Sequence, residues 1–299
     1  RTRDCQAQQL GTRPLQCPVM QFARYTTDGT PQWGIRQDDE IVPLNGLREE
    51  VTYQQLTDPG FLRVVEDAVD AAADRAIPVE DAKLLAPVPQ PGKIVCVGLN
   101  YHDHAEEQNE EVPERPLLFG KAGTAVTNPG DPIVHPATID EVDYEVELGV
   151  VIGRTAKDVS AADARDYVAG YTALNDVSGR DAQFEDEQFF RGKSYDTFAP
   201  MGPTLVPDSE LDPSSLDVAC RVNGETKQSS NTDEFIFDVP EVVEYISGIT
   251  TLRPGDVIST GTPGGVGIFR DPPELLEPGD SVDVEIEGIG TLTNPVVEE

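Results

Sequence analysis

Apolar residues are spaced first as short strands and then as two helices near the beginning of the chain. The strand-like runs lie on both sides of the Asp28-Gly29 pair, which is typical of a hairpin turn. The longer of the two helical segments covers residues 60–76, where apolar residues recur near helical spacing. A proline-bearing linker over residues 85–92 ends this part. We therefore expect a small N-terminal α+β domain of residues 20–90.

The larger remainder, residues 91–299, has apolar runs typical of buried strands and few helical stretches. The Asn223-Gly224 pair predicts a tight hairpin turn. Asp238 is a suitable N-cap for a helix, and a shorter helix is expected over residues 160–169 between two strands. This part is expected to form a second, larger domain.

The two ends of the chain differ in pattern. Residues 1–19 show neither periodicity nor apolar clustering, and Met20 would be a natural start. We expect them to be a leader segment outside the fold. Residues 281–286 and 290–292 are expected to be the last strands and to close the sheet.

Two carboxylates lie two residues apart in a strand-like run of the larger part. In a strand, Glu145 and Glu147 share one face, while Tyr144, Val146 and Leu148 pack on the other. Because two like charges so close repel each other, a divalent cation between them is one interpretation. Oxygen ligands favour hard ions such as Mg2+, Mn2+ or Ca2+. The alternative, a solvated face of an edge strand, stays open from these residues alone.

Two of the three histidines lie close together after a buried strand. His104 and Glu107 are three residues apart, so they share one face if the segment is helical, and the carboxylate could then orient the imidazole as a general base. An acidic helix start without chemistry is an alternative. A zinc site of the His-x-His type is less well supported, because His135 is the third histidine and no cysteine cluster accompanies these residues.

Composition limits the classes of partner. The net charge is −33 with 55 acidic and 22 basic residues, which excludes a general affinity for nucleic acid or anionic membranes. Dispersed acidic residues and scarce lysine are typical of a protein adapted to high salt. We expect a cytoplasmic protein, because the chain has no long apolar run and its four cysteines show no disulfide spacing. These cysteines are Cys5, Cys17, Cys96 and Cys220.

Four motifs in combination resemble the fumarylacetoacetate hydrolase family, closest to its acylpyruvase and isomerase branch. They are YEVELGVVIG at 144–153, LNDVSGRDAQ at 174–183, RGKSYDTFAPMGP at 191–203 and TGTPGGVG at 260–267. The resemblance covers the chain from residue 93 to the end. It implies an α+β fold that is mostly β, with a mixed β-roll catalytic domain after the small N-terminal domain, and a homodimer.

The resemblance also implies the site. The family's metal triad matches Glu145, Glu147 and Asp176, with Mg2+ or Mn2+ as the ion and Ca2+ as a weaker candidate. Its active-site lysine matches Lys193, which would act with the His104–Glu107 pair. Lys121 lies in a segment that is richer in glycine than the family's usual version. The residues expected to contact substrate are Lys121, Arg180, Gln183, Gly261 and Thr262.

These parts predict an enzyme acting on a small 2-oxo acid. The leading hypothesis is a hydrolase that cleaves a carbon–carbon bond in 3-acylpyruvates through an enolate, with His104 activating water. The alternatives on the same site are isomerisation of 2-hydroxy-dienedioates, decarboxylation of oxaloacetate, and dehydration of 2-keto-3-deoxy acids. A metabolite-binding protein without activity is the hypothesis from another class.

Overall fold

The structure is a computed structural model that describes residues 19–44 and 51–299. The expected leader over residues 1–19 therefore lies, apart from Val19, outside the described residues. In the described part, twelve strands form one large mixed sheet. They are β1 (Gln21–Thr26), β2 (Gln32–Gln37), β3 (Glu40–Pro43), β4 (Ile77–Pro78), β5 (Lys83–Leu85), β6 (Ile94–Gly98), β7 (Leu117–Lys121), β8 (Val126–Thr127), β11 (Val146–Ile152), β12 (Val168–Asn175), β14 (Ala199–Pro207) and β17 (Val257–Ser259).

The main sheet runs in the order β4-β3-β2-β1-β14-β12-β11-β17-β6-β7, with β5 paired to β1 and β8 paired to β14. Most pairs are antiparallel, whereas β17 pairs with β6 in parallel. The N-terminal strands belong to this sheet, because Phe22 of β1 pairs with Leu205 of β14. The expected division into two domains stays a prediction.

A second sheet carries the end of the chain. Its order is β16 (Glu225–Asn231), β15 (Asp217–Val222), β18 (Ser281–Ile286), β19 (Gly290–Glu298) and β9 (Ile133–His135). A two-stranded pair joins β10 (Val142–Asp143) to β13 (Ser178–Gly179). The last strands thus belong to a separate sheet, and β19 extends further than expected because it continues beside β9.

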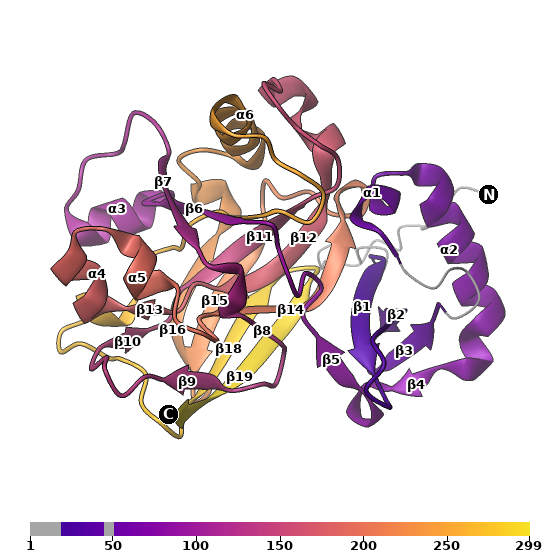
Figure 1. Cartoon of the computed structure of the whole chain (residues 1–299), viewed down its shortest axis with the longest axis horizontal. Coiled ribbons are helices and arrows are strands. Elements are labelled where there is room, and N and C mark those ends of the chain that lie inside the picture. The colour runs from indigo at the N-terminus through magenta and orange to yellow at the C-terminus, as the bar shows by residue number, and fades with distance from the viewer. Residues whose placement is uncertain (1–18, 45–50) are drawn as a thin grey trace, which may run out of the picture.

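Helices are few and lie at the margins of the sheets (Figure 1). They are α1 (Tyr53–Leu56), α2 (Pro59–Ala72), α3 (His102–Gln108), α4 (Arg180–Asp186), α5 (Phe189–Lys193) and α6 (Val239–Ile249). Helices α3, α4 and α5 gather at one end of the molecule, whereas α2 lies beside the N-terminal strands at the other. Together with the sheets, they confirm an α+β fold that is mostly β.

Local signals account for most of these elements. The Asn223-Gly224 pair joins β15 to β16 with positive φ at both residues, and Asp238 caps α6 by accepting from the Glu241 amide. The short helix expected from residue 160 is a 3-10 helix, Ala161–Tyr167. The Ser160 hydroxyl donates to Asp163 rather than capping the backbone.

Strand β11 is buried on both faces. Val146, Leu148 and Val150 point into the hydrophobic core between the two sheets, together with residues of β15 and β18. Val151 points to the opposite side, into a second core that includes residues of α2. Because β11 lies between β12 and β17, the interpretation of Glu147 as the solvated face of an edge strand is wrong.

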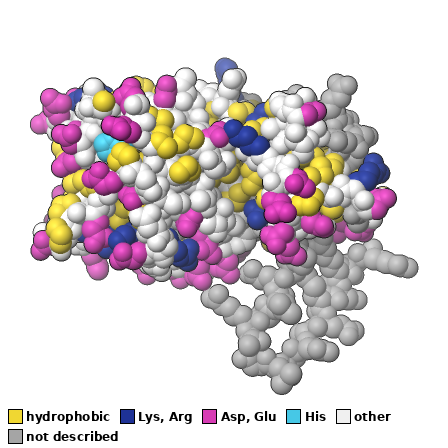
Figure 2. Space-filling model, turned by 90° about the horizontal axis from the view of Figure 1, so that it is seen from below, with side chains coloured by type: hydrophobic (Ala, Val, Ile, Leu, Met, Phe, Trp, Pro, Cys, Tyr) yellow, Lys and Arg dark blue, Asp and Glu magenta, His cyan; other side chains and the backbone are white. Residues whose placement is uncertain are grey.

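The surface carries acidic side chains in abundance. Figure 2 shows them scattered over one face, with few Lys and Arg among them. Among the described residues, no helix has both the length and the apolar character needed to cross a bilayer.

Gly170 of β12 lies against the backbone of β14. A Cβ atom there would lie 2.1 Å from the carbonyl oxygen of Val206. We expect Gly170→Ala to lower the free energy of unfolding by about 1–3 kcal/mol, because the backbones must move apart. The matched control is Gly248→Ala in α6, where, apart from the adjoining residues and backbone of its own helix, no atom lies within 4 Å of the added methyl group. It should raise stability by about 0.5–1 kcal/mol. Urea unfolding measures both, and equal effects would contradict this account.

Candidate active site

Three buried carboxylates meet where β11 begins and β12 ends. Glu147 lies in β11, Glu145 immediately precedes that strand, and Asp176 follows the last residue of β12. The Asp176 amide donates to the backbone carbonyl of Glu145 at 2.9 Å, which holds the two segments together. One oxygen from each carboxylate lies within 4.8 Å of the others. The expected strand, helix and strand order therefore does bring the third carboxylate to the first two.

This cluster suits a hard divalent cation. Carboxylate oxygens are the ligands that Mg2+ and Mn2+ prefer, and three buried like charges need positive charge between them. Among the described residues, no other group of three or more acidic, histidine or cysteine side chains has its ligand atoms close enough together to hold a metal ion. Neither His102 nor His104 belongs to it, so the geometry does not favour the zinc alternative.

Two buried ammonium groups border the triad. The Lys193 Nζ lies 2.7 Å from a Glu145 oxygen and 3.1 Å from an Asp176 oxygen. Lys121 donates to the other Asp176 oxygen and, at 3.0 Å, to the carbonyl of Val177. The glycine-rich segment around Lys121 therefore still delivers this side chain to the site. Both lysines lie where they could contact a ligand held on the carboxylates.

Arg180 ties the triad to a fourth carboxylate. Its guanidinium lies 2.7 Å from Glu145 and 2.8 Å from Asp143, and it donates to the Gln183 side-chain oxygen at 3.0 Å. Sequence reasoning missed Asp143, although its signal was present. Residues 143, 145 and 147 alternate as one face of a strand does.

The carboxylates of the triad have different proton affinities. Burial alone would raise the pKa of Glu145, but Lys193 and Arg180 outweigh it and lower the pKa to about 2. The pKa of Glu147 is raised well above its usual value, by burial first and then by the charges of Asp176 and Glu145. Without a bound cation, Glu147 therefore takes up a proton more readily than Glu145.

The end of β17 and the turn that follows it also hold Glu147. The Ser259 hydroxyl and, at 2.9 Å, the Gly261 amide both donate to the same Glu147 oxygen. The Thr262 hydroxyl accepts from the side-chain amide of Gln228 at 2.8 Å. Gly261 thus contacts the triad and Thr262 follows it in the same turn, while their contacts with substrate stay a prediction. Sequence reasoning missed Ser259, which directly precedes the motif TGTP.

The histidine pair forms as expected on α3. The His104 Nδ1 lies 3.0 Å from a Glu107 oxygen. The other Glu107 oxygen accepts from the Gly265 amide at 2.9 Å, so the glycine-rich turn holds the pair in place. The imidazole lies near enough to Glu145 that a positive charge on it would lower the pKa of that carboxyl.

Gln108 contacts the second ring nitrogen of His104. Its side-chain nitrogen lies 2.7 Å from the His104 Nε2. Sequence reasoning missed it, although positions four residues apart face each other on a helix. Both ring nitrogens of His104 are therefore engaged by side chains of the same helix.

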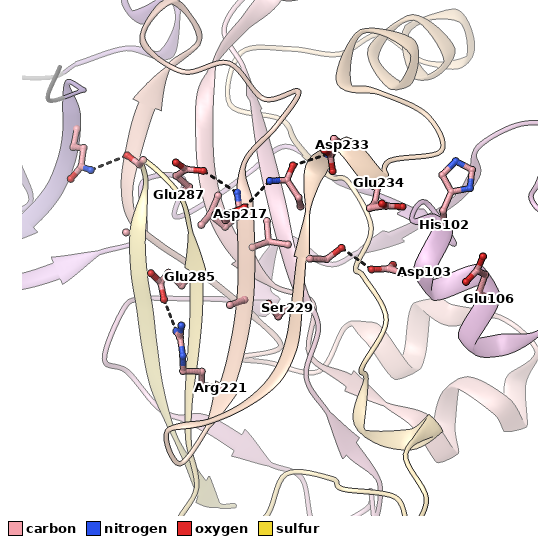
Figure 3. A pocket seen from close by; sticks show the side chains of 18 residues that line it. His102, Asp103, Glu106, Asp217, Arg221, Ser229, Asp233, Glu234, Glu285 and Glu287 are labelled. Carbon is pink, nitrogen blue, oxygen red and sulfur yellow. Dashed lines mark hydrogen bonds and ion pairs between the residues drawn. The ribbon is translucent and has the colours of Figure 1, made fainter. Parts of the chain in front are cut away.

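A broad depression elsewhere on the surface does not include the triad or its lysines (Figure 3). It has a volume of about 1170 Å³ and lies between the outer side of α3 and strands β15, β16 and β18. Among its labelled residues, Arg221 pairs with Glu285, and Asp103 accepts from Ser230. Seven acidic side chains line it, which disfavours an anionic ligand there. They are Asp103, Glu106, Asp217, Asp233, Glu234, Glu285 and Glu287.

Comparison with known families agrees with the geometry. Residues 93–297 match the family described as fumarylacetoacetate (FAA) hydrolase, C-terminal. The chain belongs to the fumarylacetoacetate hydrolase family. Residues 20–87 match a second family, described as Rv2993c-like, N-terminal.

Curated relatives within this fumarylacetoacetate hydrolase group are close in sequence. The chain is 50% identical over 224 residues to the mitochondrial oxaloacetate tautomerase FAHD2A of Bos taurus, which covers 74% of this chain and 71% of that protein. It is 48% identical over 244 residues to a fumarylacetoacetate hydrolase domain-containing protein 2 homolog of Dictyostelium discoideum, which covers 78% and 80%.

Solved structures of the fumarylacetoacetate hydrolase family share the fold. A fumarylacetoacetate hydrolase of Exiguobacterium antarcticum matches with a TM-score of 0.82 and 38% identity, covering 94% of this chain and all of that one. A 5-carboxymethyl-2-hydroxymuconate delta-isomerase of Mycobacterium smegmatis matches with a TM-score of 0.76 and 39% identity, covering 94% and 99%. The chain is therefore a member of an enzyme family.

Ion binding should compete with protons at Glu147. Because only the ionised carboxylate is a ligand, a cation must displace the proton wherever the pH is below the raised pKa of Glu147. We expect affinity for Mn2+ to weaken as the pH falls and to level off above that pKa. Below it, binding should release about one proton per ion. Calorimetric titration in two buffers of different ionisation enthalpy measures both quantities.

Two variants control this titration. Glu147→Gln should bind Mn2+ more weakly and release no proton, because its amide does not ionise. Glu106→Gln, on the outer side of α3, should behave as the unmodified protein does. An affinity that is independent of pH would contradict the assignment of Glu147 as a ligand.

Proposed function

We propose that this protein is a divalent-ion-dependent tautomerase that interconverts the keto and enol forms of oxaloacetate or a closely related 2-oxo dicarboxylic acid. One observation carries the proposal, namely the ammonium of Lys193 lying between two of the three candidate ligands, Glu145 and Asp176. Its similarity to oxaloacetate tautomerases supports the choice of substrate.

The charges of the site favour an anionic ligand. Four buried carboxylates face three buried cations, so a divalent ion would leave one net positive charge among these groups. When bound, such an ion would supply a Lewis acid for the 2-oxo and carboxylate oxygens of the substrate. The carboxylates are Asp143, Glu145, Glu147 and Asp176, and the cations are Lys121, Arg180 and Lys193.

Lys193 is the proposed proton-transfer residue. Burial alone would lower its pKa, but the Asp176 and Glu145 carboxylates outweigh it and raise the pKa, so the ammonium persists at neutral pH. In the enol-to-keto direction, an ammonium proton passes to C3 and the electron pair of the C2–C3 double bond forms the new C–H bond. The enol hydroxyl proton returns to the amine. The reverse steps generate the enol, and no proton is consumed overall.

Lys121 and Arg180 are assigned supporting roles. Lys121 reaches the same Asp176 carboxylate from the opposite side and can hold an anionic oxygen of the substrate. Arg180 is already bound to Asp143 and Glu145, so we assign it mainly to orienting Glu145. The Gln183 side chain accepts from Arg180 and extends this network.

Hydrolysis of a 3-acylpyruvate is the second candidate, favoured by the His104–Glu107 pair. In that reaction, the imidazole takes a proton from water and the resulting hydroxide adds to the distal acyl carbonyl. The C3–C4 bond then breaks, and its electron pair stays on C3, which takes up a proton. The products are a carboxylic acid and pyruvate. This reaction needs the unprotonated nitrogen of His104, whereas tautomerisation through Lys193 does not.

We expect tautomerisation of oxaloacetate to require Mg2+ or Mn2+ and to be lost after chelation. Lys193→Met should lower kcat by about 100-fold or more, because the proton-transfer group is removed. His104→Ala should retain the activity to within a few-fold. The matched control is Lys157→Met, because Lys157 pairs with Asp158 on the surface. Absorbance of the enol measures the rate.

The hydrolase alternative makes the opposite prediction. Ion-dependent cleavage of acetylpyruvate that is abolished in His104→Ala, without tautomerisation of oxaloacetate, would contradict our proposal. Equal loss of tautomerase activity in Lys193→Met and Lys157→Met would argue against Lys193 as the proton-transfer residue.

A further inference from the structure

The hydrogen bonds of His104 define which of its nitrogens carries the proton. The Glu107 carboxylate only accepts, so the Nδ1 at 3.0 Å from it must donate a proton. In the neutral imidazole, the Nε2 then holds the lone pair, and the Gln108 side-chain nitrogen at 2.7 Å can donate to it. The nitrogen that a general base would use on water is thus already occupied.

We propose that Gln108 is a positioning residue that occupies the Nε2 of His104 and keeps a hydrolytic water from that nitrogen. This inference rests on the proposed function, because it concerns the choice between two reactions of the same site. By occupying the general base, Gln108 selects proton transfer through Lys193 over cleavage of a carbon–carbon bond by water.

Only one of the two partners of His104 is held in place by the rest of the protein. The Gly265 amide donates to Glu107, and Glu107 in turn fixes the ring through the Nδ1. The ring of Phe269 lies against the imidazole, with 6.2 Å between their centroids. By contrast, within the described part of the chain, the Gln108 amide has no hydrogen-bond partner besides His104. Gln108 is therefore the group that can leave without disturbing the ring.

Removing the amide should affect the two reactions differently. In hydrolysis, a water proton passes to the Nε2, and the hydroxide cleaves the C3–C4 bond as described above. The amide competes with that water for one lone pair. Losing a hydrogen bond of ordinary net strength should therefore change the rate of cleavage by about twofold to tenfold. In tautomerisation, protons move between Lys193 and the substrate, so the Nε2 is not needed.

The first experiment compares the two reactions in Gln108→Leu and Gln108→Met, in the Mg2+-loaded protein. We expect kcat for acetylpyruvate cleavage to rise about twofold to tenfold with unchanged KM, while oxaloacetate tautomerisation stays within twofold. Glu106→Leu is the matched control, because it adds a similar apolar side chain on the outer side of the same helix. Unchanged or slower cleavage in both Gln108 variants would overturn the proposal. Two variants are compared so that the test still holds if one of them does not fold.

The second experiment observes the hydrogen bond itself. Protein labelled with 15N in its three histidines should show His104 with a protonated Nδ1 and an unprotonated Nε2, assigned by comparison with His104→Ala. In Gln108→Leu, the Nε2 resonance should shift because its donor is gone, whereas in Glu106→Leu it should not. A His104 protonated at both nitrogens in the unmodified protein, or an unmoved resonance in Gln108→Leu, would overturn the proposal.

The two experiments separate this inference from the proposed function. If the protein turns over neither substrate, the proposed function fails, while the resonance still reports whether Gln108 binds the Nε2. If tautomerisation occurs but neither the resonance nor the ratio of the two reactions changes in Gln108→Leu, the proposed function stands and the role of Gln108 is refuted.

Discussion

Mutual repulsion among buried carboxylates is the constraint around which this protein is arranged. Glu145, Glu147 and Asp176 lie within a few ångströms of one another in an interior where water does not screen their charges. Such a cluster is stable only when cations neutralise it. Lys193 and Lys121 supply part of that charge from two different elements. The negative charge that they leave unneutralised makes the site suited to a divalent ion.

The sheet holds this cluster, whereas the His104–Glu107 pair lies on a short helix. Strand β11 is packed between two strands and two hydrophobic cores, so Glu147 has little freedom. The histidine pair lies on helix α3, which is attached to the glycine-rich turn through Asp103 and Glu107. The triad thus belongs to the sheet, whereas the histidine pair belongs to a short helix held by hydrogen bonds to the glycine-rich turn.

In the proposed mechanism, the carboxylates and lysines of the sheet side stabilise a developing enolate, and in the hydrolytic alternative His104 of α3 delivers water. If Gln108 acts as proposed, a change in what the Nε2 of His104 contacts alters the delivery of water and leaves the stabilisation of the enolate in place. Such a division would allow one family to carry out related reactions. The neighbouring structures include both an isomerase and a hydrolase, as expected if the two steps are separable.

The sequence by itself determined the local elements and the identity of the triad. Turn and cap residues act through neighbouring backbone, so the hairpin at Asn223 and the start of α6 followed from short-range chemistry. The pairing of His104 with Glu107 followed from helical spacing in the same way. The tertiary structure alone decided that β11 is central and that Ser259 supports Glu147, because these contacts join residues more than a hundred positions apart. The proton affinities of the site also depend on the tertiary structure, because burial and the charges of Lys193, Arg180 and Asp176 act on the two glutamates together.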